Sequence, residues 1–318
     1  MARTFAQTHA SAVEAAIRSD AAARSPVVAS WSRSAHLHGL DPEHRRPPER
    51  LTEAELAQAR ERMEPLLKVA GPSLDKLFQT VGGVGCSVML ADSDGVPVER
   101  RGASVDDRQF HDWGLWTGAI WSEATEGTNG IGTALAERRA VTIHRDQHYL
   151  SRNTALSCMS APVHDATGQI AGVLDVSSCR DDLTEGFAAI ISHLVVEAAR
   201  KIEADVFRHA FPRARIVLVP GSDRAAAALL AVDGDDLVVG ATRSARQLLN
   251  LTGDLLAAPR PASDMLGMAG PDTLEDAERA VLQRALARHG GNVSAAARSL
   301  GISRATFHRK IGSLAQRS

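Results

Sequence analysis

The sequence predicts an α+β protein of several domains, with a separate all-helical segment at its C-terminal end. Three observations indicate this: strand patterns joined by tight turns between residues 86 and 176, a shorter group of strands between residues 215 and 242, and a strand-free stretch from residue 273 onward. A length of 318 residues exceeds that of one typical core, so we expect two or three domains.

Composition bounds the class of protein. Hydrophobic residues make up 44% and charged residues 23% of the chain, as in ordinary globular proteins. No apolar run approaches the roughly 20 residues that a membrane span needs, and the amphipathic, acid-containing N-terminus does not resemble a signal peptide. We therefore expect a cytoplasmic protein with no membrane contact.

Side chains that often carry chemistry are sparse. Cys86, Cys158 and Cys179 are odd in number and widely spaced, which favours neither a disulfide framework nor a zinc site. We expect small buried apolar residues, with a redox or metal role as the alternative. No paired carboxylates, and no nucleophile with a credible base, indicate an enzyme, so we expect no catalytic residue, metal or cofactor.

The net charge of −2 is unevenly distributed. Seven of the 36 Lys and Arg residues, and none of the 38 Asp and Glu residues, lie between Val281 and Ser318, so the first 280 residues carry a net charge of −9. A basic end on an acidic body is typical of a protein that binds a polyanion. A merely solvated tail is the alternative.

The basic end predicts three helices. Thr273 can cap the first, which ends at His289-Gly290-Gly291; Asn292 caps a shorter one to Leu300; and Ser303 caps a third from Arg304 to about Leu314. One face of the first helix is apolar and expected to be buried: Leu274, Ala277, Val281, Leu282, Ala285 and Leu286. Two short helices around a glycine turn, the second polar and basic, form a helix-turn-helix pattern.

This pattern predicts binding to double-stranded DNA through the major groove. An arginine can form two hydrogen bonds with the edge of a guanine, a threonine methyl group can contact thymine, and a lysine can neutralise a phosphate. The free N–H groups at the N-terminus of a helix can also bind phosphate. Ile302, Phe307 and Ile311 would anchor the last helix from behind. The expected DNA-contact residues are Asn292, Ser294, Ser303, Arg304, Thr306, His308, Arg309 and Lys310.

The run G-N-V-S-A-A-A-R-S-L-G-I-S-R-A-T-F-H-R-K-I, from Gly291 to Ile311, resembles the Fis-type helix-turn-helix of bacterial enhancer-binding regulators. The resemblance implies a DNA-binding domain at residues 273–318, in which Arg304, Thr306 and Arg309 meet bases or nearby backbone. It also implies a homodimer whose first helix supplies much of the contact.

The first two hundred residues predict an α+β sheet domain with helices on one face of the sheet. A helix runs from Leu51 to Ala70, with Thr52 and Glu55 as a capping box, and a second covers Pro72 to Val81. Strands are expected at residues 86–92, 96–101, 140–144, 157–163 and 170–176, before a long helix at 185–207.

Three motifs here resemble a GAF sensor domain, and more narrowly the N-terminal half of acetoin-catabolism-type regulators. They are S-W-S-R-S at residues 30–34, E-G-T-N-G-I-G-T-A-L at 126–135 and A-G-V-L-D-V-S at 171–177. The resemblance implies a GAF-like sensor domain at residues 71–207, preceded by an N-terminal helical segment at residues 1–70.

The glycine-rich motif leads into a helix and could cradle an anion. It lacks the Gly-Lys-Ser/Thr ending of a phosphate loop, so it does not indicate nucleotide hydrolysis. We favour a structural role in which Thr128 and Asn129 bond the loop backbone. His144 and His148 have the i, i+4 spacing of a helical metal site, but they flank a strand end, which favours ordinary hydrogen bonding.

A cluster of tryptophans indicates a possible ligand cavity. Such a cluster beside a sheet can wall an apolar pocket; ordinary packing of a long loop is the alternative. The resemblance implies a small effector, for which ketones, diols and alcohols are candidates. The expected ligand-binding residues are Cys86, Met89, Trp113, Trp116, Trp121 and Cys158.

Residues 213–256 resemble a truncated PAS-like fragment. A strand at Arg215–Pro220, a hairpin at Ala228–Thr242 with an Asp-Gly turn and a short helix at Ser244–Leu251 are expected. Residues 257–272 contain three prolines and indicate a linker.

Regulators of this type normally carry an ATPase domain before the DNA-binding end, and this sequence has no Walker loop. We therefore expect a ligand-responsive, sequence-specific DNA-binding transcription regulator without ATPase activity. The alternative is a sensor or dimerisation module that acts through mixed dimers with a full-length, ATPase-bearing regulator.

Overall fold

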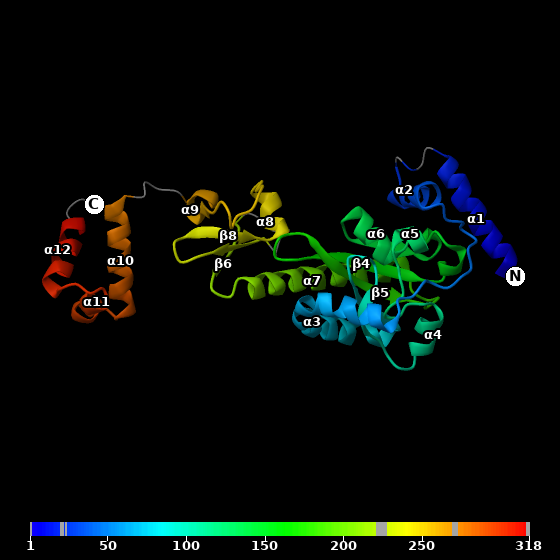
Figure 1. Ribbon diagram of the computed structural model, residues 1–318, viewed down its shortest axis with the longest axis horizontal. Coiled ribbons are helices and arrows are strands. Elements are labelled where there is room, and N and C mark those ends of the chain that lie inside the picture. The colour runs from blue at the N-terminus through cyan, green and yellow to red at the C-terminus, as the bar shows by residue number, and fades with distance from the viewer. Residues whose placement is uncertain (1, 20–21, 23, 221–227, 269–272, 316–318) are drawn as a thin grey trace. The chain divides into compact units, whose positions relative to one another are not determined.

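A computed structural model describes every residue except 1, 20, 21, 23, 221–227, 269–272 and 316–318 (Figure 1). The chain divides into two compact units, residues 1–259 and 260–318. The first unit combines helices with antiparallel sheets, and the second is almost entirely helical. This confirms the predicted α+β class, while the finer division of the first unit stays a prediction.

The larger sheet has five antiparallel strands in the order β2-β1-β5-β4-β3. The strands β1 and β4 are buried along their whole length, because both faces of the sheet are covered, and all five strands were predicted. Asp92 closes the β1–β2 turn by accepting hydrogen bonds from the backbone N–H groups of Asp94 (3.0 Å) and Val96 (2.9 Å). The strands are β1 (Cys86–Ala91), β2 (Pro97–Arg101), β3 (Val141–His144), β4 (Ser157–His164) and β5 (Ile170–Ser178).

Two long helices, α3 (Glu53–Val81) and α7 (Glu185–Ala210), cover one face of this sheet (Figure 1). Thr52 and Glu55 form the predicted capping box at the start of α3. Between helices and sheet lies the largest apolar core, whose strand contributions include Val88, Leu90, Met159 and Val176.

The prediction of two helices between residues 51 and 81 is wrong, because α3 is continuous through Pro65 and Pro72. A proline inside a helix costs about 3 kcal/mol or more. The apolar stripe, however, continues past Pro72 to Leu74, Leu77 and Val81 and packs into the same core. This packing holds the helix together, so the predicted boundary at residue 70 lies inside α3.

The other face of the sheet carries shorter elements (Figure 1), so the prediction of helices on one face only is wrong. Helix α6 (Gly130–Glu137) packs on β3, β4 and β5. The N-terminal segment, expected to be helical, supplies two of these helices. The other short elements before α7, on either side of the sheet or at its ends, are α1 (Ala2–Arg18), α2 (Pro26–Ser32), a π-helical turn (Arg33–Leu37), α4 (Asp107–Asp112), α5 (Glu123–Glu126) and 3₁₀ turns at Gly82–Val84, Arg145–Gln147 and Ser151–Asn153.

A second antiparallel sheet has the strands β6 (Arg215–Leu218), β7 (Leu229–Val232) and β8 (Leu237–Ala241), followed by α8 (Arg243–Leu248). The loop of the predicted hairpin covers residues 233–236, and not only Asp-Gly, with Asp236 at φ 63°. The C-terminal end of α7 packs on this sheet through Ala204 and Phe207. Helix α7 therefore belongs to the cores under both sheets.

In the second unit, the predicted linker contains β9 (Arg260–Pro261) and a short helix, α9 (Ala262–Met265), so it is not wholly irregular. Residues 269–272 of that linker lie outside the described residues. The three predicted helices follow as α10 (Leu274–Arg288), α11 (Val293–Ser299) and α12 (Arg304–Ala315). Within the described part of the chain, no helix is both long and apolar enough to cross a membrane.

Phe307→Ala is expected to unfold the second unit. The ring is fully buried at the centre of a small core formed by α10, α11 and α12. Its removal costs about 3–5 kcal/mol, which is comparable to the whole stability of a unit this small. Amide hydrogen exchange in α10–α12 measures the loss. Gln283→Ala, at an exposed position of α10, is the control and should change stability by less than about 0.5 kcal/mol; equal exchange in both variants contradicts the prediction.

Candidate DNA-binding surface and sensor core

The three C-terminal helices begin at the residues that the sequence predicts. Thr273 Oγ1 accepts a hydrogen bond from Asp276 N (3.1 Å), Asn292 Oδ1 from Ala295 N (3.1 Å) and Ser303 Oγ from Thr306 N (3.1 Å). Each bond satisfies a backbone donor that the first turn of a helix leaves free. Gly301, at φ 68°, makes the turn between α11 and α12. These caps fix the residues at which α10, α11 and α12 begin.

Helix α12 is anchored by its apolar side and exposed on its polar side. Phe307 is fully buried against Ala296 and Ala297 of α11, and Ile302 and Ile311 pack beside it. Small alanines allow the backbones of the two helices to approach closely. The arrangement confirms the predicted anchoring from behind.

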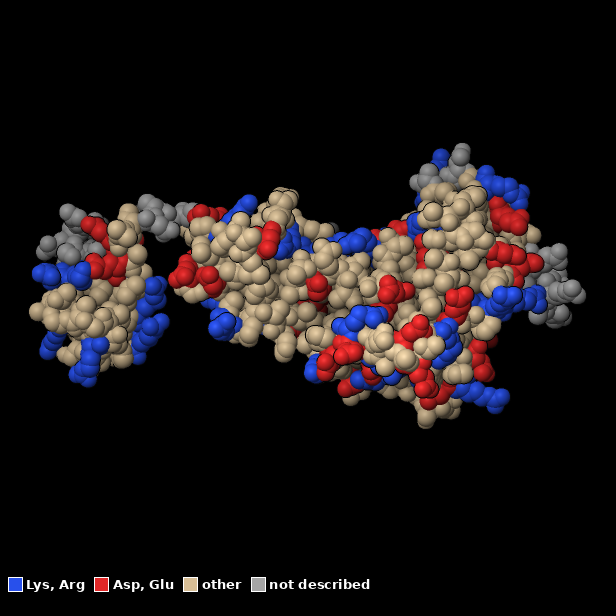
Figure 2. Space-filling model, in the orientation of Figure 1, with Lys and Arg blue, Asp and Glu red and all other residues tan. Residues whose placement is uncertain are grey.

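The predicted DNA-contact residues lie mostly on one accessible surface. Arg304, His308 and Arg309 are exposed on α12, and among the described residues no ion pair engages either arginine. Thr306 is half-buried beside the cap. In Figure 2 the acidic side chains of α10 gather near the end where this helix begins, and separate groups of basic side chains lie among uncharged residues over the rest of the visible surface. Asn292, Ser294 and Ser303 are also exposed.

Lys310 differs from the expectation. Its ammonium group forms an ion pair with the Glu278 carboxylate of α10, and its side chain is 34% exposed. The residue thus helps to hold α12 against α10.

In the sheet domain, the prediction that Cys86 shares a cavity with Met89 and Cys158 is wrong. Cys86 belongs to the core under α3 and α7, whereas Met89 and Cys158 belong to the core on the opposite face of the sheet. Successive side chains in a strand point to opposite faces. Cys86 and Met89 are three positions apart in β1, so they cannot face the same side.

The three tryptophans pack together with Met89 and Cys158, as expected, but they do not line a common open wall. Trp121 is 1% exposed, and its indole N–H donates to Gly114 O (2.9 Å). Trp116 lies under the guanidinium group of Arg100, and Trp113 is half-buried. For Trp121 the structure therefore favours ordinary packing of the loop.

All three cysteines are buried free thiols in the structure. Burial raises the pKa of Cys86 to about 11 and that of Cys179 to about 12. Burial also raises the pKa of Cys158 well above its ordinary value. Protonated, enclosed thiols are poor nucleophiles, which agrees with the interpretation of small apolar residues.

The two histidines form hydrogen bonds within the protein. His148 is fully buried, its Nδ1 lies 2.9 Å from Arg145 O, and burial lowers its pKa to about 4. His144 Nδ1 lies 2.8 Å from Ser157 Oγ. No group of three or more potential metal ligands occurs in the part of the chain that is described. The hydrogen-bonding interpretation is the one that the geometry supports.

A buried carboxylate, Glu123, joins the N-terminal segment to the sheet domain. Arg33 donates to it through Nε (2.8 Å) and Nη2 (3.0 Å), and Thr133 through its hydroxyl (3.1 Å). Ser30 donates to the same carboxylate and also lies 2.7 Å from Thr128 Oγ1. The hydrogen bond with Glu123 is the main cause that raises the pKa of Arg33. Sequence reasoning singled out both motifs but not their contact with each other.

The glycine-rich motif brings α6 into close contact with its neighbours. Asn129 Oδ1 accepts from Gly132 N (2.9 Å), and its amide donates to Gly127 O (2.8 Å), which confirms the structural role predicted for this residue. A Cβ atom on Gly130 would lie 2.4 Å from Ser160 Oγ, and one on Gly132 would lie 2.4 Å from Glu123 N. The loop is therefore an internal junction, not an exposed anion cradle.

Asp175, at the centre of the sheet, lies under the start of α6. Its carboxylate accepts hydrogen bonds from Ser160 and from Ser177 (2.7 Å). A Cβ atom on Gly130 would approach Asp175 Oδ1 to 2.9 Å. Burial raises the pKa of Asp175 to about 6, while the two hydroxyl groups oppose this rise.

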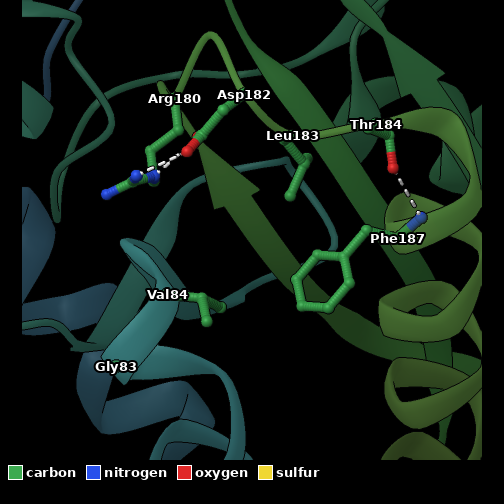
Figure 3. Close-up of a pocket in the computed structure, with 7 residues that line it drawn as sticks. All are labelled: Gly83, Val84, Arg180, Asp182, Leu183, Thr184 and Phe187. Carbon is green, nitrogen blue, oxygen red and sulfur yellow. Dashed lines mark hydrogen bonds and ion pairs between the residues drawn. The ribbon is translucent and has the colours of Figure 1, made fainter.

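A pocket lies elsewhere, where the turn after α3 meets the start of α7 (Figure 3). Its volume is about 370 Å³. Arg180 and Asp182 on its rim neutralise each other through Nε–Oδ1 (2.8 Å) and Nη2–Oδ2 (2.7 Å) contacts. Val84 and Phe187 supply its apolar wall (Figure 3). None of the predicted ligand-binding residues lines it.

Residues 4–203 match the family described as "MimR, N-terminal domain", and residues 273–313 match "Bacterial regulatory protein, Fis family". The chain is 32% identical over 234 residues to the acetoin catabolism regulatory protein of Cupriavidus necator, covering 72% of this chain and 35% of that protein. It is 29% identical over 198 residues to the acetoin dehydrogenase operon transcriptional activator AcoR of Bacillus subtilis, covering 62% and 33%.

A third relative is the propane 2-monooxygenase operon transcriptional activator MimR of Mycolicibacterium smegmatis, 32% identical over 167 residues, covering 52% of this chain and 27% of that protein. The chain thus spans about a third or less of the length of these relatives. Among solved structures, the crystal structure of the E. coli DhaR(N)–DhaL complex matches with a TM-score of 0.51 at 17% identity. The match covers 75% of this chain and 80% of that chain, and it shows the fold alone.

Arg33→Met is expected to release the N-terminal segment. The change leaves the Glu123 carboxylate, 5% exposed, without its cation, and breaking a buried pair costs about 3–5 kcal/mol. The rate of amide exchange in α2 should rise sharply. In Arg33→Lys, which keeps the charge but not the two parallel hydrogen bonds, this rate should rise less. Unchanged protection of α2 in Arg33→Met would show that the pair does not hold the segment.

Asp175 is expected to make the sheet domain less stable as the pH rises. A pKa of about 6, above the ordinary 3.8, means that the folded state retains the proton more tightly. Its stabilisation is complete below about pH 4 and is lost as the pH rises through 6, amounting to about 3 kcal/mol. Calorimetric melting of the protein and of Asp175→Asn at pH 4, 5, 6 and 7 isolates this effect. A stability difference between the two that is independent of pH rules it out.

Proposed function

Because the chain belongs to the family of the MimR N-terminal domain and carries a Fis-family module at residues 273–313, we propose that it is a sequence-specific DNA-binding transcription regulator that responds to a small-molecule effector. Such a protein acts where bacterial DNA lies, in the cytoplasm. The observation that carries the proposal is the exposed, cationic face of α12 with Phe307 buried behind it.

The roles of the surface residues follow from their positions. Helix α12 enters the major groove, where Arg304 and Arg309 are free to reach guanine edges and the Thr306 methyl group to contact thymine. Asn292 uses its side-chain oxygen to cap α11, so its amide group remains to donate to a phosphate. Ser294 lies exposed in the same first turn and is expected to bond the phosphate as well.

A two-fold dimer would present two such helices to DNA. Leu274 and Val281 of α10, which were expected to be buried, are 92% and 42% exposed. Burying them in a second copy would be favourable. Two-fold symmetry requires half-sites separated by about one turn of DNA.

Regulation is proposed to be passive. The sequence has no Walker loop. Between the two family matches, the described part of residues 204–272 holds the end of α7, the second sheet and short segments. Without ATP hydrolysis, the protein would repress, co-regulate or activate by changing its affinity for DNA. An effector produces such a change only if it binds the two states with different affinity.

The effector site is proposed on the face of the large sheet that carries Met89, Cys158, Trp113 and Trp116. The relatives are named for acetoin catabolism, an acetoin dehydrogenase operon and a propane 2-monooxygenase operon. Ketones, diols and alcohols are therefore the first candidates to test.

A second candidate function is a sensor or dimerisation module in mixed dimers with a longer relative. It is supported by the shared domain at residues 4–203 in a chain that spans a third of such relatives. Footprinting with the purified protein separates the two: protected inverted repeats support an independent regulator, and DNA affinity without sequence preference supports the mixed dimer.

Arg304→Ala is expected to weaken specific DNA binding by about 1–3 kcal/mol while leaving non-specific binding largely intact. Titrated footprints, or fluorescence anisotropy with specific and scrambled duplexes, measure this. Arg279→Ala is the matched control, because Arg279 pairs with Asp276 on α10 and should not touch bases. An unchanged specific footprint in Arg304→Ala would remove α12 from its reading role.

A further inference from the structure

Arg100 lies on the face of the sheet where the effector site is proposed. It stands opposite Met89 in the β1–β2 register, and Met89 belongs to the core that contains the tryptophans. Its side chain is only 9% exposed. The Arg100 guanidinium group, a cation, therefore lies inside the region where the sequence predicts a small-ligand site.

The guanidinium group of Arg100 is held in a fixed orientation. Its central carbon lies 4.2 Å from the ring centroid of Trp116 and 5.4 Å from that of Phe110, within the range of a cation–π interaction. Nη1 donates to the Asp107 carboxylate at 2.7 Å. These contacts use the faces of the group and one of its nitrogens.

The edge formed by Nε and Nη2 has no hydrogen-bond partner within the described part of the chain. Nε and Nη2 of Arg100 are both buried, and neither has a hydrogen-bond acceptor among the described residues. A buried donor without an acceptor is costly. An oxygen atom placed at this edge would remove the penalty for both nitrogens.

The same edge of arginine binds carboxylates elsewhere in this chain. Nε and Nη2 of Arg33 hold the two oxygens of Glu123, at 2.8 and 3.0 Å. Nε and Nη2 of Arg180 hold Asp182 in the same way, at 2.8 and 2.7 Å, as the dashed lines in Figure 3 show. The planar fork fits a carboxylate with two parallel hydrogen bonds.

We propose that the Nε–Nη2 edge of Arg100 binds the carboxylate group of the effector, whose body packs against the neighbouring aromatic rings. This proposal rests on the proposed function, and it identifies the small-molecule effector of that function as a carboxylate. A neutral ketone or alcohol offers one oxygen and no charge, so it fills the fork less well. A phosphate dianion is disfavoured because Asp107 already supplies one negative charge to the same guanidinium group.

Binding at this edge requires a movement. Both nitrogens are covered, and a Cβ atom on Gly102 would lie 2.1 Å from Nη2. The covering segment, residues 102–121, contains α4 and the tryptophans. It must open to admit a ligand, so the effector favours a different arrangement of this segment, as an effector must in order to change affinity for DNA.

Isothermal titration calorimetry on the full chain tests the proposal with acetate, propionate, pyruvate and benzoate, and with acetamide, propionamide and benzamide as uncharged partners. At least one carboxylate should bind, with its amide weaker by about tenfold or more. Arg100→Met should weaken that carboxylate by about 10–100-fold. Arg100→Lys, which keeps the charge without the fork, should recover only part of the affinity.

Arg180→Met is the matched control, because its fork is filled by Asp182, and it should leave carboxylate binding unchanged. Circular dichroism and melting verify that each variant is folded. The proposal is overturned if no carboxylate of the panel binds, if Arg100→Met and Arg100→Lys bind as the unaltered protein does, or if acetone or 2,3-butanediol binds with an affinity that both variants preserve. In each case a sequence-specific footprint still supports the regulator, so the two proposals fail separately.

Discussion

The arrangement of the sensor core depends on one buried carboxylate. Glu123 receives hydrogen bonds from Ser30 and Arg33 of the N-terminal segment and from Thr133 of α6. An ionised carboxylate with so little exposure is tolerated only when its oxygens are fully paired. The positions of the N-terminal segment, the glycine-rich loop and α6 therefore depend on one another. Moving any one of the three would leave a buried charge or hydroxyl group without its hydrogen-bond partner.

Features that depend on local chemistry were predictable from the sequence. Apolar runs bounded by turn residues located the five strands of the large sheet. The caps Asn292 and Ser303 located α11 and α12, because a cap bonds a backbone group only two or three residues away. The continuous α3 was not predicted, since the local effect of Pro72 was outweighed by burial of Leu74 and Leu77 in a core that the sequence alone does not show.

The candidate sites were only partly predictable, for a related reason. Strand alternation alone separates Cys86 from Met89, so that error was avoidable. The contact between Ser30 and Glu123 joins residues 93 positions apart, and no local pattern encodes it. Arg100 gave no signal because a charged residue in an outer strand ordinarily faces solvent, and only the structure places it under Trp116.

Helix α7 serves as the common wall of two sheets, with Ile191 and Val195 under the larger and Ala204 and Phe207 under the smaller. The 26-residue helix thus connects the two sheets rigidly. The number of residues between the two contacts sets the angle around the helix axis between the face that packs on one sheet and the face that packs on the other. Adding or deleting one residue in the span between them would rotate one attachment by about 100° relative to the other. The length of this span is thus as tightly constrained as the identity of its buried side chains, whereas most surface loops tolerate insertion.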